Sequence, residues 1–337
     1  GTVGFFHHQG CCQLPPDLDR VTETLISLGC SPNVGAALIV SLGCEGTDTE
    51  RLYEMIRATG KPVEIIRIQE LGGVSAAIKA GIDAAQELVM DISRVTMSIK
   101  CGASDTTSGM ASNCVIGYVA DKLVDLGATV VFGETTEFLG GEHLLARRAV
   151  TLEVGQKILD IVDRMEKRAR SLGCDMRKGQ PTPGNIAGGL SSIEEKSLGA
   201  IVKSGTRPIQ GVLEYPERIG ERKGLWIKDT PGREPEILTG MAATGAQFML
   251  FSTGRGAPQG FPTMPVLKIC GNPNTYERMQ HDMDINAGHI ITGERSIEEV
   301  GEEAYAAVLA LLSGRQTKNE TLGYHSSIDI YTLGPVI

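Results

Sequence analysis

The pattern that most constrains the fold is an apolar run, a turn and a helical segment, repeated four times in the first half of the chain. The apolar runs cover residues 36–42, 62–68, 96–100 and 129–132. The helical segments that follow them cover residues 49–59, 73–89, 108–126 and 141–172. Repeats of this kind predict parallel strands joined by crossover helices. We therefore expect an α/β protein with largely parallel sheets.

The second half continues the alternation, with strands expected at 208–212, 247–252 and 265–269 and helices from 192 and over 296–312. Between the halves, residues 173–189 are rich in glycine and proline. This segment is either a linker or a loop that reaches back over the site of the first domain. At roughly 150 residues per domain, we expect two Rossmann-like domains. Residues 1–178 would carry a strand-end site, and residues 179–337 would contribute glycine-rich loops, Lys196 and Arg255.

Charge and hydropathy exclude two classes of function. The chain has 337 residues and a formal net charge of −9, with 32 basic and 41 acidic side chains. This balance argues against a nucleic-acid binder, which needs positive charge to displace counterions from phosphate. No apolar run approaches the 18 or more residues that are typical of a membrane span. We expect neither nucleic-acid nor membrane partners.

The eight cysteines are too few for a disulfide scaffold in a chain of this length. They predict reduced thiols and a cytoplasmic protein. The sequence shows no signal peptide and begins at Gly1 with an apolar run that reads as the start of a strand. We expect residues upstream of Gly1 to be missing.

Polar residues follow several of the predicted strands. Cys44 and Glu45 follow the first apolar run, Lys100 and Cys101 end the third, and Glu134 follows the fourth. Ligands of parallel sheets bind beyond the carboxyl ends of the strands. We therefore expect these residues to form one group.

Metal ligation is one interpretation of the cysteines near strand ends. Cys11, Cys44 and Cys101 each adjoin glycine after a strand-like run, and His7 lies at ligand spacing to Cys11. Thiolates and imidazole suit iron or zinc. The alternative is that these cysteines are small buried apolar residues.

Carboxylates and cations offer further candidates, each with a structural alternative. Glu137 and Asp105 are either site residues or helix caps. Arg255, between two glycines after an apolar run, is placed either for carboxylate capture or as a solvated loop residue. Lys196 is a general base if it is desolvated, and otherwise an exposed charge.

Several ordered blocks spread along nearly the whole chain resemble the altronate/galactarate dehydratase family, which is related to the large subunit of sulfolactate sulfo-lyase. These blocks are HHQGC at 7–11, LGCE at 42–45, KCGASDTTSG at 100–109, GETTEFLGGE at 133–142, PTPGNIAGGLSSIEEKSLG at 181–199, STGRGAPQG at 252–260 and MDINAG at 283–288.

The resemblance implies a hydro-lyase that removes water from a sugar acid and gives a 2-keto-3-deoxy acid. It also implies a divalent metal, Fe²⁺ in preference to Mn²⁺, for which we predict His7, Cys11, Cys44 and Cys101 as ligands. An iron–sulfur cluster on the three cysteines is the alternative. Lys196, His7 and the pair Glu134 and Glu137 are the candidates for the base and the acid, and the sequence does not assign the two roles. Arg255 would stabilise the ene-diolate. We predict substrate contacts from a second set of residues, namely Lys100, Asp105, Ser108, Asn185 and Arg255.

Two alternatives to sugar-acid dehydration stay open. The blocks SDTTSG and GETTE resemble the sulfo-lyases, whereas Cys11, residues 43–45 and Arg255 follow the dehydratase pattern. Family dehydratases also carry a small N-terminal β-rich domain, to which nothing here corresponds. We therefore expect a small β-domain or a separate small subunit as a partner. The second alternative is that this chain is a large subunit that is inactive without that partner. Base rates favour a homo-oligomer.

Overall fold

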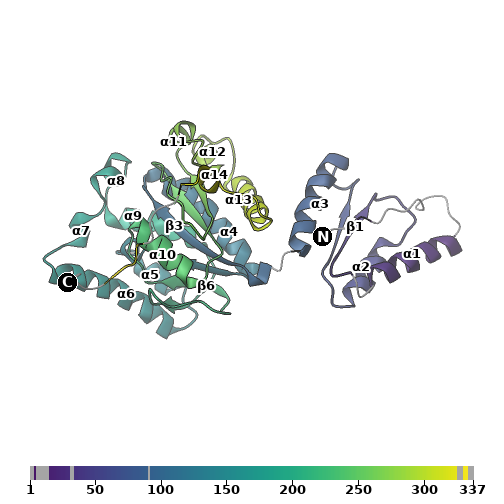
Figure 1. Ribbon diagram of the computed structural model, residues 1–337, viewed down its shortest axis with the longest axis horizontal. Helices are drawn as coiled ribbons and strands as arrows, with labels where there is room; N and C mark the ends of the chain where they lie inside the picture. The colour runs from purple at the N-terminus through teal and green to yellow at the C-terminus, as the bar shows by residue number, and fades with distance from the viewer. Residues whose placement is uncertain (1–3, 5–14, 31–33, 90–91, 325–328, 333–337) are drawn as a thin grey trace. The chain divides into compact units, whose positions relative to one another are not determined.

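The computed structural model describes residues 4, 15–30, 34–89, 92–324 and 329–332 (Figure 1). The chain divides into two compact units, Gly1–Asp91 and Ile92–Ile337. The predicted boundary near residue 178 is therefore wrong. A single sheet in the second unit takes strands from both sides of that position, so the chain cannot separate there.

The first unit is a small α/β layer. Two parallel strands pair in register, with Ala37 opposite Val63. A core of Ile26, Leu52, Ile56 and Val63 joins the helices to this pair. Its elements are α1 (Pro15–Gly29), β1 (Ala37–Ser41), α2 (Thr49–Arg57), β2 (Val63–Arg67) and α3 (Val74–Val89).

The second unit is built on a seven-stranded sheet in the order β5-β6-β4-β3-β7-β8-β9, in which every neighbouring pair is parallel. The predicted α/β class with parallel sheets is confirmed. The strands are β3 (Thr96–Gly102), β4 (Thr129–Phe132), β5 (Ile209–Leu213), β6 (Gly224–Lys228), β7 (Phe248–Thr253), β8 (Val266–Cys270) and β9 (Ile285–Asn286).

Helices and shorter helical turns connect these strands (Figure 1). The longer helices are α4 (Asn113–Asp125), α6 (Leu152–Ser171), α9 (Ile193–Ile201), α10 (Glu234–Thr244) and α13 (Ile297–Leu312). The shorter ones are α5 (Glu142–Ala146), α7 (Met176–Gly179), α8 (Pro183–Ala187), α11 (Pro273–Arg278), α12 (Gly288–Ile291) and α14 (Lys318–Leu322). The 3₁₀ turns η1 (Ile92–Arg94), η3 (Thr135–Glu137) and η4 (Val202–Ser204) and the π-helical turn η2 (Ser108–Ser112) complete the connections.

The central strands β3, β4, β7 and β8 are buried along their whole length. A parallel sheet that is covered on both faces reads as continuous apolar sequence, and this explains why these four strands are visible as apolar runs. In contrast, the expected helix over 141–172 is broken. Thr151 begins α6 by accepting a hydrogen bond from the Val154 amide at 3.2 Å, which leaves α5 as a separate short helix.

The glycine- and proline-rich segment 173–189 lies within the second unit and forms α7 and α8. Thr182 caps α8 through a reciprocal pair of hydrogen bonds with Asn185. Of the two interpretations of this segment, the loop over a site is the one that the structure supports, because Asp175, Gln180 and Asn185 line a cavity described below.

The six described cysteines are free thiols. Among the described residues, no helix is both long and apolar enough to cross a bilayer.

A buried lysine on β6 makes the stability of the fold depend on pH. Lys228 Nζ donates to the Glu217 carbonyl at 2.8 Å and to Thr244 Oγ1 at 2.5 Å. Burial lowers the pKa of Lys228 from 10.5 to about 8, against a smaller opposing effect of Glu217. Between these two pH values the unfolded chain binds the proton that the folded chain has released. The contribution of Lys228 to the free energy of unfolding therefore rises with pH across this interval.

We expect the Lys228→Met variant to lack this contribution. Denaturant titrations would give the free energy of unfolding of the wild type and of the variant at pH 7 and at pH 10.5. We expect the wild-type value minus the variant value to be larger at pH 10.5 than at pH 7. The matched control is Lys167→Met, which replaces a lysine whose side chain is 73% exposed and should leave the difference constant. A constant difference for Lys228→Met would show that Lys228 stays charged in the fold.

Candidate active site

The strand ends of the second unit bring three predicted residues together. Lys100 and Cys101 lie near the end of β3, and Glu134 follows the neighbouring strand β4. The Glu134 backbone has φ of 71°, an uncommon conformation for a residue with a side chain. Its carboxylate accepts hydrogen bonds from Lys100 Nζ at 3.1 Å and from the Cys101 amide at 2.9 Å. Of the five residues that we expected to form one group, Lys100, Cys101 and Glu134 lie together, whereas Cys44 and Glu45 belong to the first unit.

Glu137, at the end of η3, joins this group. Its Oε2 accepts a hydrogen bond from the Cys101 thiol, with Sγ at 2.8 Å. Its Oε1 lies 3.5 Å from Lys196 Nζ. Lys196 also donates to Gln180 Oε1 at 2.9 Å, and its side chain is 12% exposed. Lys196 is therefore partly desolvated and paired with a carboxylate at the edge of the buried group.

Lys203 is the residue that sequence reasoning missed. It lies in η4, is fully buried, and its ammonium contacts three side chains at once. These contacts are Cys101 Sγ at 2.9 Å, Glu137 Oε2 at 3.2 Å and a short ion pair with Glu134 Oε2. A lysine before a Ser-Gly turn is usually exposed, so the sequence carries no signal for its burial.

The pKa values of the buried group follow from this pairing. Burial and the carboxylates of Glu134 and Glu137 raise the pKa of the Cys101 thiol well above its usual value, although Lys203 opposes them. Burial alone would lower the pKa of Lys203, but Cys101, Glu134 and Glu137 raise it well above the usual value. Burial opposes the ionisation of Glu137, but the nearby lysines bring its pKa down to about 2. At neutral pH the group therefore holds a protonated thiol, a charged Lys203 and an ionised Glu137.

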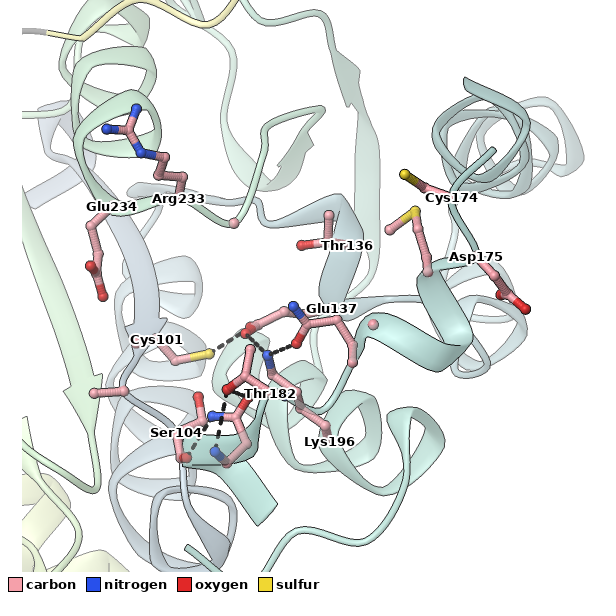
Figure 2. Close-up of a pocket in the computed structure, with 17 residues that line it drawn as sticks. Cys101, Ser104, Thr136, Glu137, Cys174, Asp175, Thr182, Lys196, Arg233 and Glu234 are labelled. Carbon is pink, nitrogen blue, oxygen red and sulfur yellow. Dashed lines mark hydrogen bonds and ion pairs between the residues drawn. The ribbon is translucent and has the colours of Figure 1, made fainter. Parts of the chain in front are cut away.

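A cavity of about 610 Å³ opens beside Cys101, Glu137 and Lys196 (Figure 2). Hydroxyl and amide groups of five residues line it, namely Ser104, Thr136, Gln180, Thr182 and Asn185. Charged lining comes from Glu137, Asp175, Lys196, Arg233 and Glu234. Such a lining suits a small ligand that carries hydroxyl groups and an anionic group. Glu134 and Lys203 are not among the lining residues, and they lie behind the cavity wall.

One of the predicted substrate-binding residues lines this cavity, and the other four do not. Asn185 lines it, while its Nδ2 donates to the Ser104 carbonyl at 2.9 Å. Lys100, Asp105, Ser108 and Arg255 are not among its lining residues. Asp105 accepts from the Ser108 amide at 3.0 Å, which fits its interpretation as a cap. Arg255 donates to the Gly184 carbonyl at 2.5 Å.

The predicted metal ligands are also divided. His7 and Cys11 lie outside the described residues. Cys44 belongs to the first unit, where it is exposed and accepts a hydrogen bond from Gln69 Nε2 at 3.2 Å. Cys44 and Glu45 therefore follow a strand of a different sheet from Cys101, because β1 belongs to a separate sheet in which, within the part of the chain that the structure describes, it pairs with β2. Within the described residues, Cys101, Glu134 and Glu137 form a buried group that could hold a metal ion, since their donor atoms lie within 4.8 Å of one another.

Comparison with protein families decides the assignment. Residues 92–336 match the family described as D-galactarate/altronate dehydratase, C-terminal, and residues 1–93 match D-galactarate dehydratase/altronate hydrolase, second domain. The chain belongs to the D-galactarate/altronate dehydratase family. The junction between the two matches coincides with the division of the structure after Asp91.

Members of the dehydratase family that resemble this chain are lyases. The (2R)-sulfolactate sulfo-lyase subunit beta of Chromohalobacter salexigens is 38% identical over 97% of this chain and 86% of its own length. The galactarate dehydratase of Escherichia coli is 34% identical over 93% of this chain and 63% of its own length. The altronate dehydratase of Bacillus subtilis is 31% identical over 93% of this chain and 64% of its own length. The chain thus spans less than two thirds of these two dehydratases.

Replacing Glu134 should strongly destabilise the second unit. Glu134→Gln removes the carboxylate that pairs with both Lys100 and Lys203, whose side chains are 1% and 0% exposed. Breaking a buried ion pair in this way costs about 3–5 kcal/mol of unfolding free energy. Chemical denaturation monitored by circular dichroism measures it.

The double variant Glu134→Gln/Lys203→Met should be less destabilised than the sum of the two single variants, because it leaves fewer unpaired buried charges. The control Glu153→Gln, at an exposed position, should change stability by no more than about 0.5 kcal/mol. Additive effects of the two single substitutions would contradict the direct coupling.

Proposed function

We propose that the protein is a hydro-lyase that removes water from a sugar acid of the altronate or galactarate type and yields a 2-keto-3-deoxy acid. Family membership supports the lyase class. The observation that carries the proposal is the Lys196–Glu137 pair, whose Nζ and Oε1 lie 3.5 Å apart at the wall of a cavity lined with hydroxyl and amide groups.

The reaction requires two proton transfers. A base removes the C2 proton, α to the carboxylate, and the electron pair forms the C2–C3 double bond as the C3–O bond breaks. The departing hydroxyl takes a proton and leaves as water. The resulting enol then tautomerises to the 2-keto acid. Hydroxide is a poor leaving group, so an acid near C3 and a cation near the carboxylate both lower the barrier.

We assign these tasks to groups in the cavity wall. The Lys196 ammonium binds the substrate carboxylate and stabilises the charge that develops on it. Lys196 and Glu137 together carry out the proton transfers. Gln180, Thr182 and Asn185 accept and donate hydrogen bonds to substrate hydroxyls. Arg255 acts indirectly, because its contact with the Gly184 carbonyl holds the turn that carries Asn185.

The family resemblance implies a divalent metal, and among the described residues the group of Cys101, Glu134 and Glu137 is the candidate to hold it. The thiol and two carboxylates of Cys101, Glu134 and Glu137 suit iron or manganese by chemical type. Each of these three side chains, however, already contacts the Lys203 ammonium. We therefore derive no step through a metal at this group. The predicted metal site on His7, Cys11, Cys44 and Cys101, and the alternative cluster on the three cysteines, are competing hypotheses, which the cobalt titration described below tests through Cys101.

Two substitutions of Lys196 distinguish its role in proton transfer from the role of its positive charge. We expect Lys196→Met to lower kcat about 10²–10⁴-fold, the usual contribution of a general acid or base. Lys196→Arg keeps the positive charge, but a guanidinium with a pKa above about 12 does not release its proton. It should therefore keep KM near the wild-type value, and kcat should still fall, although less than in Lys196→Met because the guanidinium continues to stabilise the developing charge.

The control for both variants is Lys167→Met, at an exposed lysine of α6 that pairs with Asp163. It should leave kcat and KM unchanged. Recovery of kcat in Lys196→Arg would assign Lys196 to electrostatic stabilisation alone, with no part in proton transfer.

The function itself is tested by its products. The purified chain would be incubated anaerobically with altronate, galactarate and sulfolactate, with and without Fe²⁺ or Mn²⁺, while 2-keto acid and sulfite are followed together. Keto acid without sulfite from a sugar acid is the expected result. Its absence from altronate and galactarate, in the presence of the partner described below, would contradict the proposal.

Elimination of sulfite from sulfolactate is the second candidate. The 38% identity to a sulfo-lyase subunit over 97% of this chain favours it. Sulfite, however, departs as a stable anion and needs no acid near the leaving group. The partly buried ammonium of Lys196, paired with Glu137, is more useful to dehydration, and we place dehydration first for this reason.

We further propose that the active enzyme includes a partner. The name of the relative from Chromohalobacter salexigens describes a subunit, and this chain covers only 63% of the Escherichia coli galactarate dehydratase. A small β-domain or a separate small subunit would supply what this chain lacks. Co-expression with such a chain, followed by size-exclusion chromatography and turnover assays, tests whether it is required and whether the chain forms homo-oligomers.

A further inference from the structure

The buried group behind the cavity contains its own cation. The donor atoms of Cys101, Glu134 and Glu137 are arranged as a metal site would require, within 4.8 Å of one another. Lys203 Nζ contacts all three side chains, including Cys101 Sγ at 2.9 Å and Glu137 Oε2 at 3.2 Å. We infer that the Lys203 ammonium takes the place of a metal ion in this group and keeps divalent metals out of it.

The charge balance of the group supports this inference. Lys100 and Lys203 bring two positive charges, and Glu134 and Glu137 bring two negative charges, all on buried side chains. A divalent ion that displaced the proton of the Cys101 thiol would add one net positive charge beside two ammonium groups. Uncompensated charge in a dry interior is strongly unfavourable. The group is electrically complete without a metal.

The backbone that carries Lys203 leaves the ammonium little freedom to withdraw. Helix α4 approaches η4 so closely that a Cβ at Gly117 would lie 2.5 Å from the Val202 carbonyl oxygen. Asp121 of the same helix accepts a hydrogen bond from the Thr206 amide at 2.7 Å. Arg148 donates to Ser204 Oγ at 2.8 Å. A metal could enter only by displacing a side chain whose main chain is fixed on both sides.

Cobalt absorption tests the inference directly, because a cobalt–thiolate bond gives a charge-transfer band in the near ultraviolet. The full-length chain would be titrated with Co²⁺ under anaerobic, reducing conditions. We expect wild type and Cys101→Ser to give the same spectrum, since the other cysteines contribute equally to both. A cobalt–thiolate band in the wild type that Cys101→Ser removes would overturn the inference.

The Lys203→Met variant provides the converse test. Without the ammonium, the two carboxylates and the Cys101 sulfur, which loses its proton as it binds the metal, should bind about one additional Co²⁺ per chain. The new band should vanish in Lys203→Met/Cys101→Ser. A folded Lys203→Met that gains no band dependent on Cys101 would show that Lys203 is not what excludes the metal.

If Lys203→Met fails to fold, the comparison of wild type with Cys101→Ser still tests whether a divalent metal enters the group, and a Cys101-dependent band would overturn the inference. None of these readouts involves turnover. The inference can therefore fail while the lyase proposal stands, and the lyase proposal can fail without affecting it.

Discussion

The buried ion pairs of Lys203 and Lys100 with Glu134 and Glu137 are the interaction on which the site depends. They join four separate pieces of the second unit, namely the end of β3, the turn after β4, η3 and η4. Each charge would be prohibitively unfavourable in this interior if it stood alone, so each fixes the position of the others. The left-handed backbone of Glu134 is strained by itself. It is held because its carboxylate receives hydrogen bonds from three directions.

This buried arrangement determines what the cavity presents to a substrate. Glu137 belongs both to the buried group and to the cavity wall. Its Oε2 faces the Cys101 thiol and Lys203, while its Oε1 faces Lys196 at the wall. The fixed charges behind it hold the Lys196–Glu137 pair in a low-dielectric setting before any ligand arrives. Preorganised charge of this kind stabilises a transition state more effectively than solvent that must first reorient.

The sequence predicted the parts of the fold that obey local rules. Strands such as β4 appear as apolar runs because a parallel sheet buries both of its faces. The strand-end rule also placed Lys100, Cys101 and Glu134 together. It failed for Cys44, because a strand end says nothing about which sheet a strand joins, and β1 pairs with β2 in a sheet separate from that of β3. The boundary near 178 failed because a glycine- and proline-rich segment also suits a loop over a site. The sequence did not indicate that Lys203 is buried, because its burial depends on three partners from elsewhere in the chain.

Lys196 and Lys203 show why position decides chemistry more than residue type. They lie seven positions apart, in α9 and in the η4 turn that follows it. Lys196 has one carboxylate partner and lines the cavity, where we propose that it acts on the substrate. Lys203 has two carboxylates and a thiol as partners and no exposure, so its proton is retained and its charge is structural. In the reaction that we propose, Lys196 acts at the cavity wall while Lys203 neutralises Glu137 from the buried side, and the Oε1 atom of Glu137 stays available to the cavity.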